Sequence, residues 1–413
     1  MSEFIAAANR VVVTGVGIVS SLGNDGETFF DALYMGRTAV SRKEYPHLCS
    51  PVAGAQFDST KHYSKIELLG LDRGSQFAMF AADCAIQSSG IDREELPKAA
   101  VFWGTGGGGF ESLELAYQRM YGGRTSTSIG LSSIIPAAMV HAPAAQISIR
   151  YGIRGECLTY STACSSASIA FGEAWGRVRS GMRDVAIVGG SECPLVPGVV
   201  AGWQNMRVLS QDDDDGQAWC RPFSKGRQGF CLGEGAASFV LESLEHAKRR
   251  GANILAEVVG YGVSNDGSHI TRPNVRGQEV AIRNAIESAG ISSNDIGYVN
   301  AHGTGTNAGD AAECASMGLV FCNESKRPLV SSTKAAHGHT LGASGAIELV
   351  AVVHALLRQK VPPTINWIEA DKDTQGWDFV ANLGRPAQLE YAMSNSFAFG
   401  GCNAVIIMRK SQN

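Results

Sequence analysis

A single cysteine stands in a segment whose composition suits nucleophilic chemistry. Cys164 lies in Tyr160–Ala167 (YSTACSSA), and the small residues that follow it predict a buried helix from Ser165 to Arg179. At a helix N-terminus the unpaired backbone N–H groups and the helix dipole stabilise a thiolate, the reactive form of cysteine. A buried structural cysteine is the commoner fate of this residue, so this segment alone leaves both interpretations open.

Histidine and lysine occur in two glycine-containing segments that each follow a predicted strand. The first holds His302 in Ala301–Thr306 (AHGTGT), where a side chain at a strand end would face the crevice in which α/β folds bind ligands. The second places Lys334, His337 and His339 within six residues. The two histidines could bind a metal ion, but no third ligand of the right kind follows nearby, so we expect no metal site.

A turn between two apolar strands is the fourth segment of interest. It spans Ser396–Asn403 (SFAFGGCN) and contains Phe399 and Gly400. Glycine permits a close backbone approach, and such a turn can supply an N–H donor to a developing negative charge.

The apolar pattern predicts the elements that position these segments. Strand-length apolar runs alternate with helix-length runs, which indicates an α/β protein with a largely parallel sheet. In the first half the predicted strands are 10–15, 99–103, 185–190 and 235–241, and the predicted helices are 26–35, 73–89, 134–151 and 163–180. In the second half the strands are 256–263, 297–301 and 329–332, and the helices are 277–289, 308–321 and 343–358.

The alternation begins a second time after about residue 252, which predicts a duplicated fold. Val11–Ser20 is echoed by Ala256–Ser264, and the small-residue helix after Cys164 is echoed by Gly342–Val350. Two helices of alanine, serine and glycine could pack closely at the centre of such a pair. The predicted halves are 1–252, with the candidate nucleophile, and 253–413, with both candidate histidines.

Composition excludes several classes of function. The 413 residues suit two packed domains or one duplicated domain, and 44% hydrophobic with 18% charged residues is ordinary for a soluble enzyme. The net charge of −4 gives no case for a nucleic acid or membrane partner. The ten cysteines form no Cys-x-x-Cys pair, and we expect no signal peptide or membrane span, which together predict reduced thiols in a cytoplasmic protein.

Two glycine clusters fail the nucleotide motifs that they superficially match. Gly15-x-Gly17 is followed by Ser20 where the dinucleotide motif needs its third glycine, and 104–109 lacks the Gly-Lys-Ser/Thr ending of a phosphate loop. Tight turns at strand ends explain both.

Together the four segments resemble those of the β-ketoacyl-acyl carrier protein synthases, the condensing enzymes of the thiolase superfamily. Thr-Ala-Cys, Ala-His-Gly-Thr-x-Thr, Lys-x-x-x-Gly-His and Phe-Gly-Gly occur in the family's order and spacing, and residues 220–235 match a further family stretch. The resemblance covers essentially the whole chain. It implies a synthase II-like enzyme with a thiolase-like α/β fold, its duplicated halves in a five-layered αβαβα arrangement.

The resemblance also implies catalytic roles. Cys164 would accept an acyl group from the phosphopantetheine thioester of an acyl carrier protein, with the Cys164 and Phe399 N–H groups as the oxyanion hole. Malonyl-carrier protein would then lose CO₂, and His302 and His339, both neutral, would donate N–H groups to the enolate that attacks the Cys164 thioester. Lys334 would keep both imidazoles neutral. No cofactor is expected, since the phosphopantetheine arrives on the carrier protein.

Supporting residues are implied in the same way. The expected substrate-binding residues are Thr304, Thr306, Gly107 and Gly400, and the expected structural residues are Glu348 and Asp310. Glu348 would pair with Lys334, the two threonines would hydrogen-bond the pantetheine arm, and Phe399 would gate the acyl pocket.

Several positions depart from the family's fatty-acid members. Asp212–Asp215 lies where several synthases carry a basic residue that meets the acidic carrier protein, and like charges would slow docking. Gly107 replaces a bulkier aliphatic residue, which would deepen the acyl pocket toward the dimer interface. Ser224 and Gln228 replace residues that are usually acidic. These features favour polyketide, polyene or specialised-lipid synthesis slightly over fatty-acid elongation.

Two other superfamily activities are alternatives. A thiolase-type acyl-CoA acyltransferase has its second cysteine ahead of a glycine run, whereas Cys402 follows one. A chain-length-factor-like, non-catalytic subunit has lost the nucleophile, whereas Cys164 is present. We therefore expect acyl and malonyl thioesters as substrates, in a homodimer or in a heterodimer with a chain-length-factor-like subunit.

Overall fold

A ten-stranded sheet forms the frame of the molecule, in the order β11-β10-β14-β15-β9-β1-β8-β6-β4-β5. The computed structural model describes residues 8–46, 48–122, 133–211, 219–323 and 327–412. The N-terminal strands are β1 (Val11–Val19), β4 (Ala100–Gly104), β5 (Cys157–Tyr160), β6 (Val185–Glu192) and β8 (Gly235–Ser243). The C-terminal strands are β9 (Ala256–Asn265), β10 (Ile296–Asn300), β11 (Leu329–Ser331), β14 (Tyr391–Phe397) and β15 (Cys402–Lys410).

The two halves of the sheet have the same topology. In the N-terminal half β4 pairs in parallel with β5 and β6, and β6, β8 and β1 follow one another antiparallel. In the C-terminal half β10 pairs in parallel with β11 and β14, and β14, β15 and β9 follow antiparallel. The sequence echo between 11–20 and 256–264 therefore marks equivalent strands, β1 and β9, which pair at the centre.

The prediction of a largely parallel sheet is wrong. Among the described strands of this sheet, five pairings are antiparallel and four are parallel. Both faces of each half are covered by helices, so the antiparallel strands are as continuously apolar as parallel ones. An unbroken run of apolar residues in a strand indicates that both faces of the strand are buried, but it does not indicate whether the strand is parallel or antiparallel to its neighbours.

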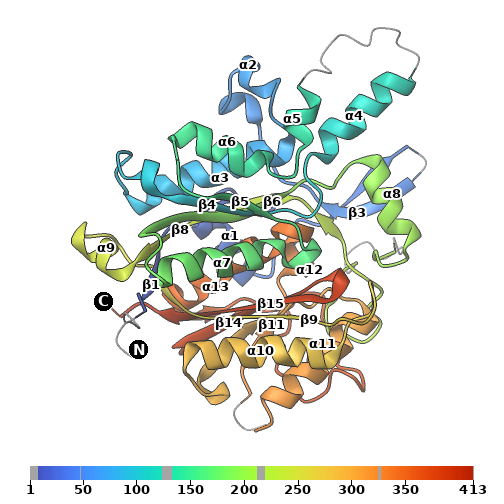
Figure 1. Cartoon of the computed structure of the whole chain (residues 1–413). Coiled ribbons are helices and arrows are strands. Elements are labelled where there is room, and N and C mark those ends of the chain that lie inside the picture. The colour runs from blue at the N-terminus through green and yellow to red at the C-terminus, as the bar shows by residue number, and fades with distance from the viewer. Residues whose placement is uncertain (1–7, 47, 123–132, 212–218, 324–326, 413) are drawn as a thin grey trace.

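Five layers are visible in Figure 1, as the family resemblance implied. Helices α3 (Arg73–Ser89) and α6 (Ala142–Tyr151) lie outside the N-terminal half of the sheet, and α10 (Val275–Ala289) and α11 (Asn307–Val320) lie outside the C-terminal half. Between the half-sheets lie α7 (Ser166–Arg179) and α13 (Ser344–Arg358). The predicted boundary at residue 252 falls in the connection between α9 (Leu244–Arg249) and β9.

Smaller elements complete the described chain. The other helices are α1 (Gly26–Tyr34), α2 (Lys65–Leu68), α4 (Phe110–Tyr121), α5 (Ile134–Ala138), α8 (Pro197–Asn205) and α12 (Lys334–His337). The short strands are β2 (Ser41–Tyr45), β3 (Leu48–Ala53), β7 (Leu232–Gly233), β12 (Lys360–Val361) and β13 (Arg385–Pro386). The predicted helix 134–151 is thus two helices, because Met139 leaves the helical conformation and Pro143, which lacks an N–H, lies in the first turn of the next helix.

The central helices pack as closely as their small residues predicted. A Cβ atom on Gly345 of α13 would lie 2.0 Å from Ser168 Oγ of α7, so only glycine fits there. The span Leu341–Arg358 is long and apolar enough to cross a membrane, but 89% of it is buried within the molecule. It is therefore explained as the core helix of the fold.

Candidate active site

Cys164 lies in a sharp turn between β5 and α7. One 3₁₀ turn, η3 (Ala163–Ser165), precedes the helix, which begins at Ser166 and not at Ser165. Ala163 has a φ of +51°, a left-handed conformation that residues with a Cβ atom rarely adopt. Such strain is retained where the surrounding structure fixes a functional group.

The C-terminal half repeats this turn with a different residue at its tip. There η6 (Leu341–Ala343) precedes α13, and Leu341 has a φ of +46°. Gly342 occupies the position equivalent to Cys164, and its N–H donates to the carboxylate of Glu192 at 3.0 Å. The duplicated fold therefore contains two equivalent elbows, of which one carries a thiol.

Two imidazoles face the thiol. His339 Nε2 lies 3.1 Å from Cys164 Sγ, and its Nδ1 lies 2.8 Å from Ser344 Oγ. The His302 ring is nearly perpendicular to that of His339, with the ring centroids 5.5 Å apart. One ligand atom from each of the three residues lies within 4.8 Å of the other two. The fold thus brings together residues from both halves.

Both histidines are neutral at physiological pH. Burial lowers the pKa of each well below its ordinary value, and the nearby Lys334 ammonium lowers it further. When the Ser344 hydroxyl donates to His339 Nδ1, the ring proton lies on Nε2, which faces the cavity. Neutral imidazoles can then serve as N–H donors.

The charge that acts on these rings belongs to a buried ion pair. Lys334, on α12, pairs with Glu348 of α13, and both side chains are fully buried. Burial raises the pKa of Glu348 to about 7, while the Lys334 ammonium opposes that rise. The pair places a fixed positive charge behind the two imidazoles without exposing it to the cavity.

The expectation that the helix terminus makes Cys164 a thiolate is wrong for the resting protein. Burial raises the pKa of Cys164 to about 12, and the Glu192 carboxylate contributes to the rise. Lys334 and a backbone N–H from Phe399 act in the opposite direction but do not offset it. The thiol is 6% exposed, so loss of hydration outweighs the helix dipole.

A cavity of about 220 Å³ opens onto the thiol, His302 and His339. Its walls include the apolar side chains of Trp203, Val208, Phe230 and Phe397 and the hydroxyl-bearing Thr304 and Thr306. A mostly apolar cavity that opens onto a thiol and two imidazoles suits an apolar ligand that carries a polar reactive group.

The Phe399 turn closes one side of this cavity. The Phe399 backbone N–H is directed at the Cys164 sulfur, and the Phe399 ring packs on Trp203 with the ring centroids 6.0 Å apart. Gly400 has a φ of +83° and donates its own N–H to the Ile270 carbonyl at 2.7 Å. The turn therefore directs one backbone donor at the sulfur and uses the next for its own structure.

Family models match most of the chain. The model described as "Beta-ketoacyl synthase, N-terminal domain" matches residues 8–247, and "Beta-ketoacyl synthase, C-terminal domain" matches residues 255–367. The chain belongs to the β-ketoacyl synthase family. It is accordingly an acyltransferase of the ketosynthase class, which carries out β-ketoacyl-acyl carrier protein condensation in fatty-acid or polyketide biosynthesis.

Individual relatives cover nearly the whole chain. Nodulation protein E of Rhizobium meliloti (strain 1021) is 39% identical over 410 residues, 97% of this chain and 99% of that protein. The 3-oxoacyl-[acyl-carrier-protein] synthase 2 of Staphylococcus aureus (strain COL) is 38% identical, over 97% of this chain and 98% of its own. The solved ishigamide ketosynthase/chain length factor superposes with a TM-score of 0.91 at 31% identity, over 98% of this chain and 100% of that one.

Two of the residues predicted to bind substrate in this ketosynthase do not line the cavity. A Cβ atom on Gly107 would lie 1.7 Å from Phe110 Cζ, so the Phe110 ring already fills the space that we expected to deepen the acyl pocket. Gly400 shapes the turn through its positive φ, and its N–H is bonded to the Ile270 carbonyl, so it offers no donor to a substrate. Asp212–Asp215 lies outside the described residues.

The two neighbouring histidines of the Lys334 segment do not form a pair. His337 Nε2 lies 3.0 Å from Thr333 Oγ1, and burial lowers its pKa to about 3. The three residues whose ligand atoms do lie close together are Cys164, His302 and His339, which come from distant segments of the sequence. A metal ion there would require the thiolate, which burial disfavours, and the expected absence of a metal stays a prediction.

Sequence reasoning missed Glu192, at the end of β6. Its buried carboxylate accepts N–H groups from Gly107 at 3.1 Å and Gly342 at 3.0 Å, and also from Gly106. It thereby ties the glycine loop after β4 to the second elbow. An acidic residue closing an apolar strand was the signal available in the sequence.

Proposed function

We propose that Cys164 carries the acyl chain of a decarboxylative condensation in which His302 and His339 stabilise the enolate. The observation that carries this proposal is the convergence of the Cys164 thiol, two neutral imidazoles and the Phe399 N–H at the end of an apolar cavity. Each of these groups meets a separate chemical requirement of the reaction.

The first step transfers an acyl group between two sulfurs. The Cys164 sulfur attacks the carrier-bound thioester, the carbon–sulfur bond to the pantetheine breaks, and the pantetheine leaves as a thiol with the proton that Cys164 gives up. The step involves no net proton, so a thiol with a raised pKa can take part. The Phe399 N–H is placed to bind the oxyanion of the tetrahedral intermediate.

The second step forms the new carbon–carbon bond. The malonyl thioester loses CO₂, and its bonding electrons form an enolate whose oxygen accepts N–H groups from His302 and His339. The enolate carbon attacks the Cys164 thioester, and the sulfur leaves and is reprotonated. The Lys334 charge matters here, because a protonated imidazole would pass its proton to the enolate and quench it.

The partners and pathway are proposed from the family. We propose that both thioesters arrive on an acyl carrier protein, with no cofactor held by the enzyme, and that the pathway is polyketide, polyene or specialised-lipid synthesis. The similarity to a solved type II PKS ketosynthase in complex with its acyl-carrier protein, with a TM-score of 0.89 at 28% identity over 98% of this chain and 100% of that one, supports this choice. We also propose a cytoplasmic location, supported by ten cysteines that form no disulfide.

Acyl loading tests the nucleophile. Incubation with an acyl-carrier protein should add the acyl mass to the peptide that contains Cys164, and Cys164→Ala should abolish both loading and condensation. Circular dichroism of the variant checks that the fold is kept. Modification of a different cysteine, or none with any donor, contradicts the assignment.

The two partial reactions test the histidines. His302→Ala should slow malonyl decarboxylation by about 100-fold or more, the usual effect of removing one donor to an oxyanion, while acyl loading changes little. Equal loss in both steps would show that His302 serves the structure of the cavity and not the enolate.

A further inference from the structure

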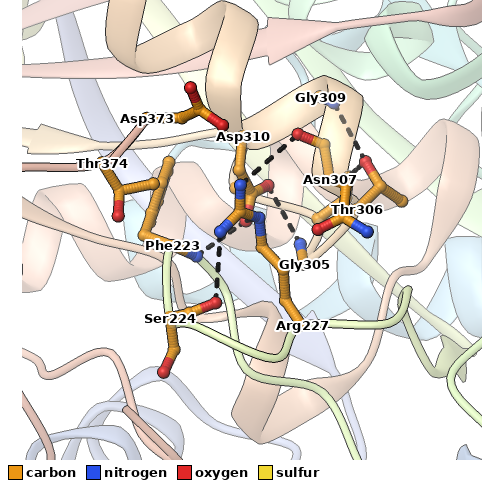
Figure 2. Close-up of polar contacts among 12 residues, drawn as sticks. Phe223, Ser224, Arg227, Gly305, Thr306, Asn307, Gly309, Asp310, Asp373 and Thr374 are labelled. Atoms are coloured by element: carbon orange, nitrogen blue, oxygen red, sulfur yellow. Dashed lines mark hydrogen bonds and ion pairs between the residues drawn. The ribbon is translucent and has the colours of Figure 1, made fainter. Parts of the chain in front are cut away.

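Arg227 is a buried cation that the condensation does not use. Its side chain is 1% exposed, with Nε 3.6 Å from Asp310 Oδ2 and Nη1 paired with Asp371. The Nη1 group also donates to the Ser224 carbonyl at 3.2 Å. Figure 2 shows the guanidinium beside the Asp310 carboxylate, at the start of α11.

Asp310 connects this cation to the substrate cavity. Its Oδ1 accepts the N–H of Gly305 at 3.0 Å, and its Oδ2 accepts the N–H of Phe223 at 2.7 Å. Gly305 has a φ of +79°, so the turn at this point is one that few other residues could adopt. One carboxylate therefore joins the turn at residues 302–306 to the segment that carries Arg227 (Figure 2).

The turn at residues 302–306, which Asp310 holds, contains Thr304 and Thr306, the two threonines that line the cavity. The Thr304 and Thr306 hydroxyls lie 2.9 Å apart, and both residues line the cavity beside His302. Thr306 also caps α11 by accepting the Gly309 N–H at 3.2 Å. A shift of Gly305, which stands between the threonines, would move both hydroxyls relative to the catalytic groups.

Arg227 favours the charged form of the Asp310 carboxylate. Burial raises the pKa of Asp310 to about 7, and the Arg227 guanidinium and the two backbone N–H groups oppose this rise. Without the guanidinium the pKa of Asp310 would rise further, and the more fully protonated carboxyl would be a poorer acceptor for the Gly305 N–H.

The carboxylates around Arg227 lie far from it in the sequence. The balancing carboxylates come from two other segments, as Asp310 of α11 and as Asp371 from the loop after β12. The guanidinium therefore joins three separate parts of the chain.

We propose that Arg227 is a positioning residue for the pantetheine arm, acting through Asp310 on the turn that presents Thr304 and Thr306. The proposal rests on the proposed function, since it assumes that both thioesters reach Cys164 through this cavity. Arg227 contacts neither the thiol nor the imidazoles in the described structure. Its effect should therefore fall on binding of the arm in both half-reactions and not on the reactivity of Cys164.

Three variants of the full-length enzyme test this. Arg227→Lys keeps the positive charge but removes the planar guanidinium group that can bond two carboxylates at once. Asp371→Asn weakens the ion pair by removing the charge of Asp371, whose side chain is 25% exposed. Lys225→Met is the matched control, because Lys225 lies on the same segment and its ion pair with Glu369 is exposed. The measurements are KM and kcat with acyl- and malonyl-pantetheine, and the rate at which iodoacetamide labels Cys164.

The expected result separates binding from reactivity. Arg227→Lys should raise KM for both thioesters by about tenfold or more, with kcat within about threefold and Cys164 labelling unchanged, and Asp371→Asn should act in the same direction. Lys225→Met should match the wild type. An unchanged KM in Asp371→Asn, or labelling that changes in parallel with KM, overturns the proposal. Wild-type enzyme that does not load Cys164 at all would instead overturn the proposed function.

Discussion

The reactivity of Cys164 depends on a balance between burial and the charges around it. Burial and the Glu192 carboxylate raise the thiol pKa, while Lys334 and the Phe399 N–H lower it. The resting state is therefore a thiol beside a neutral His339 and not an ion pair. Such a nucleophile is protected from adventitious oxidation and alkylation until a thioester fills the cavity, because only the thiolate reacts readily.

The pH dependence of alkylation tests this balance. Below the pKa, the thiolate fraction rises tenfold per pH unit, so iodoacetamide labelling of Cys164 should rise about 100-fold from pH 8 to pH 10 without levelling off. Mass spectrometry of the Cys164 peptide measures the rate, and the exposed Cys322 in the same sample shows that reagent is not limiting. A plateau near pH 9 would mean an ordinary thiol.

At this scale the sequence identified the reacting residues but not their state. The family resemblance carried by the segments of Cys164, His302 and His339 predicted a condensing site, and the fold brings these three residues together. The thiolate prediction failed because a helix terminus can be seen in sequence, whereas the depth of burial depends on both halves of the fold.

At the scale of elements, the contact between α7 and α13 fixes the catalytic residues relative to one another. The elbow with Cys164 leads into α7, and the segment with His339 leads into α13. Gly345 meets Ser168 where the helices approach, and Ser168 Oγ lies 2.8 Å from Ser396 Oγ on β14. Any separation of these helices would lengthen the 3.1 Å contact between imidazole and thiol.

A pair of glycine substitutions tests this contact. Gly345→Ala should lower the free energy of unfolding by about 1–3 kcal/mol, because its Cβ would overlap Ser168 at 2.0 Å. Gly176→Ala, on α7 itself, meets nothing within 4 Å and should raise stability by about 0.5–1 kcal/mol. Chemical denaturation measures both. Equal effects of the two changes on the free energy of unfolding would show that helix propensity, and not the packing of α7 on α13, determines the effect of Gly345→Ala.

The periodicity predicted most elements but not the short connections that aim side chains. The helix at 73–89 and the strand starts at 185, 235 and 256 agree with the structure. The 3₁₀ turns before α7 and α13 were not predicted, because Ala163 and Leu341 have no local preference for a positive φ. Tertiary contacts impose those conformations.

For the whole molecule, the outer strand of the N-terminal half leaves an edge open. Among the described residues β5 pairs only with β4, and its Leu158 is 39% exposed. The equivalent edge at β11 is partly covered, because Val330 donates its N–H to the Asp378 carbonyl. In the same half, α4 and α5 carry exposed apolar side chains such as Tyr121 and Ile135. We propose that a second subunit covers β5.

Sedimentation equilibrium tests this association. The wild-type chain should sediment at twice its monomer mass, and Leu158→Lys should weaken the association by at least about tenfold by placing a charge on the covered edge. Leu383→Lys, at a position 72% exposed in the C-terminal half, is the control and should remain dimeric. A wild-type chain that stays monomeric until a chain-length-factor-like subunit is added would identify a heterodimer.

The second elbow shows why the duplicated fold repeats the turn at Cys164 but not its thiol. A Cβ atom on Gly342 would lie 2.2 Å from the Gly106 nitrogen and 2.5 Å from Glu192 Oε2, so no cysteine could replace that glycine. The Glu192 side chain accepts the backbone N–H groups of Gly106, Gly107 and Gly342 there. On the proposed function, one polypeptide therefore holds one acyl chain at a time, and an assembly gains a second only by adding a second catalytic copy.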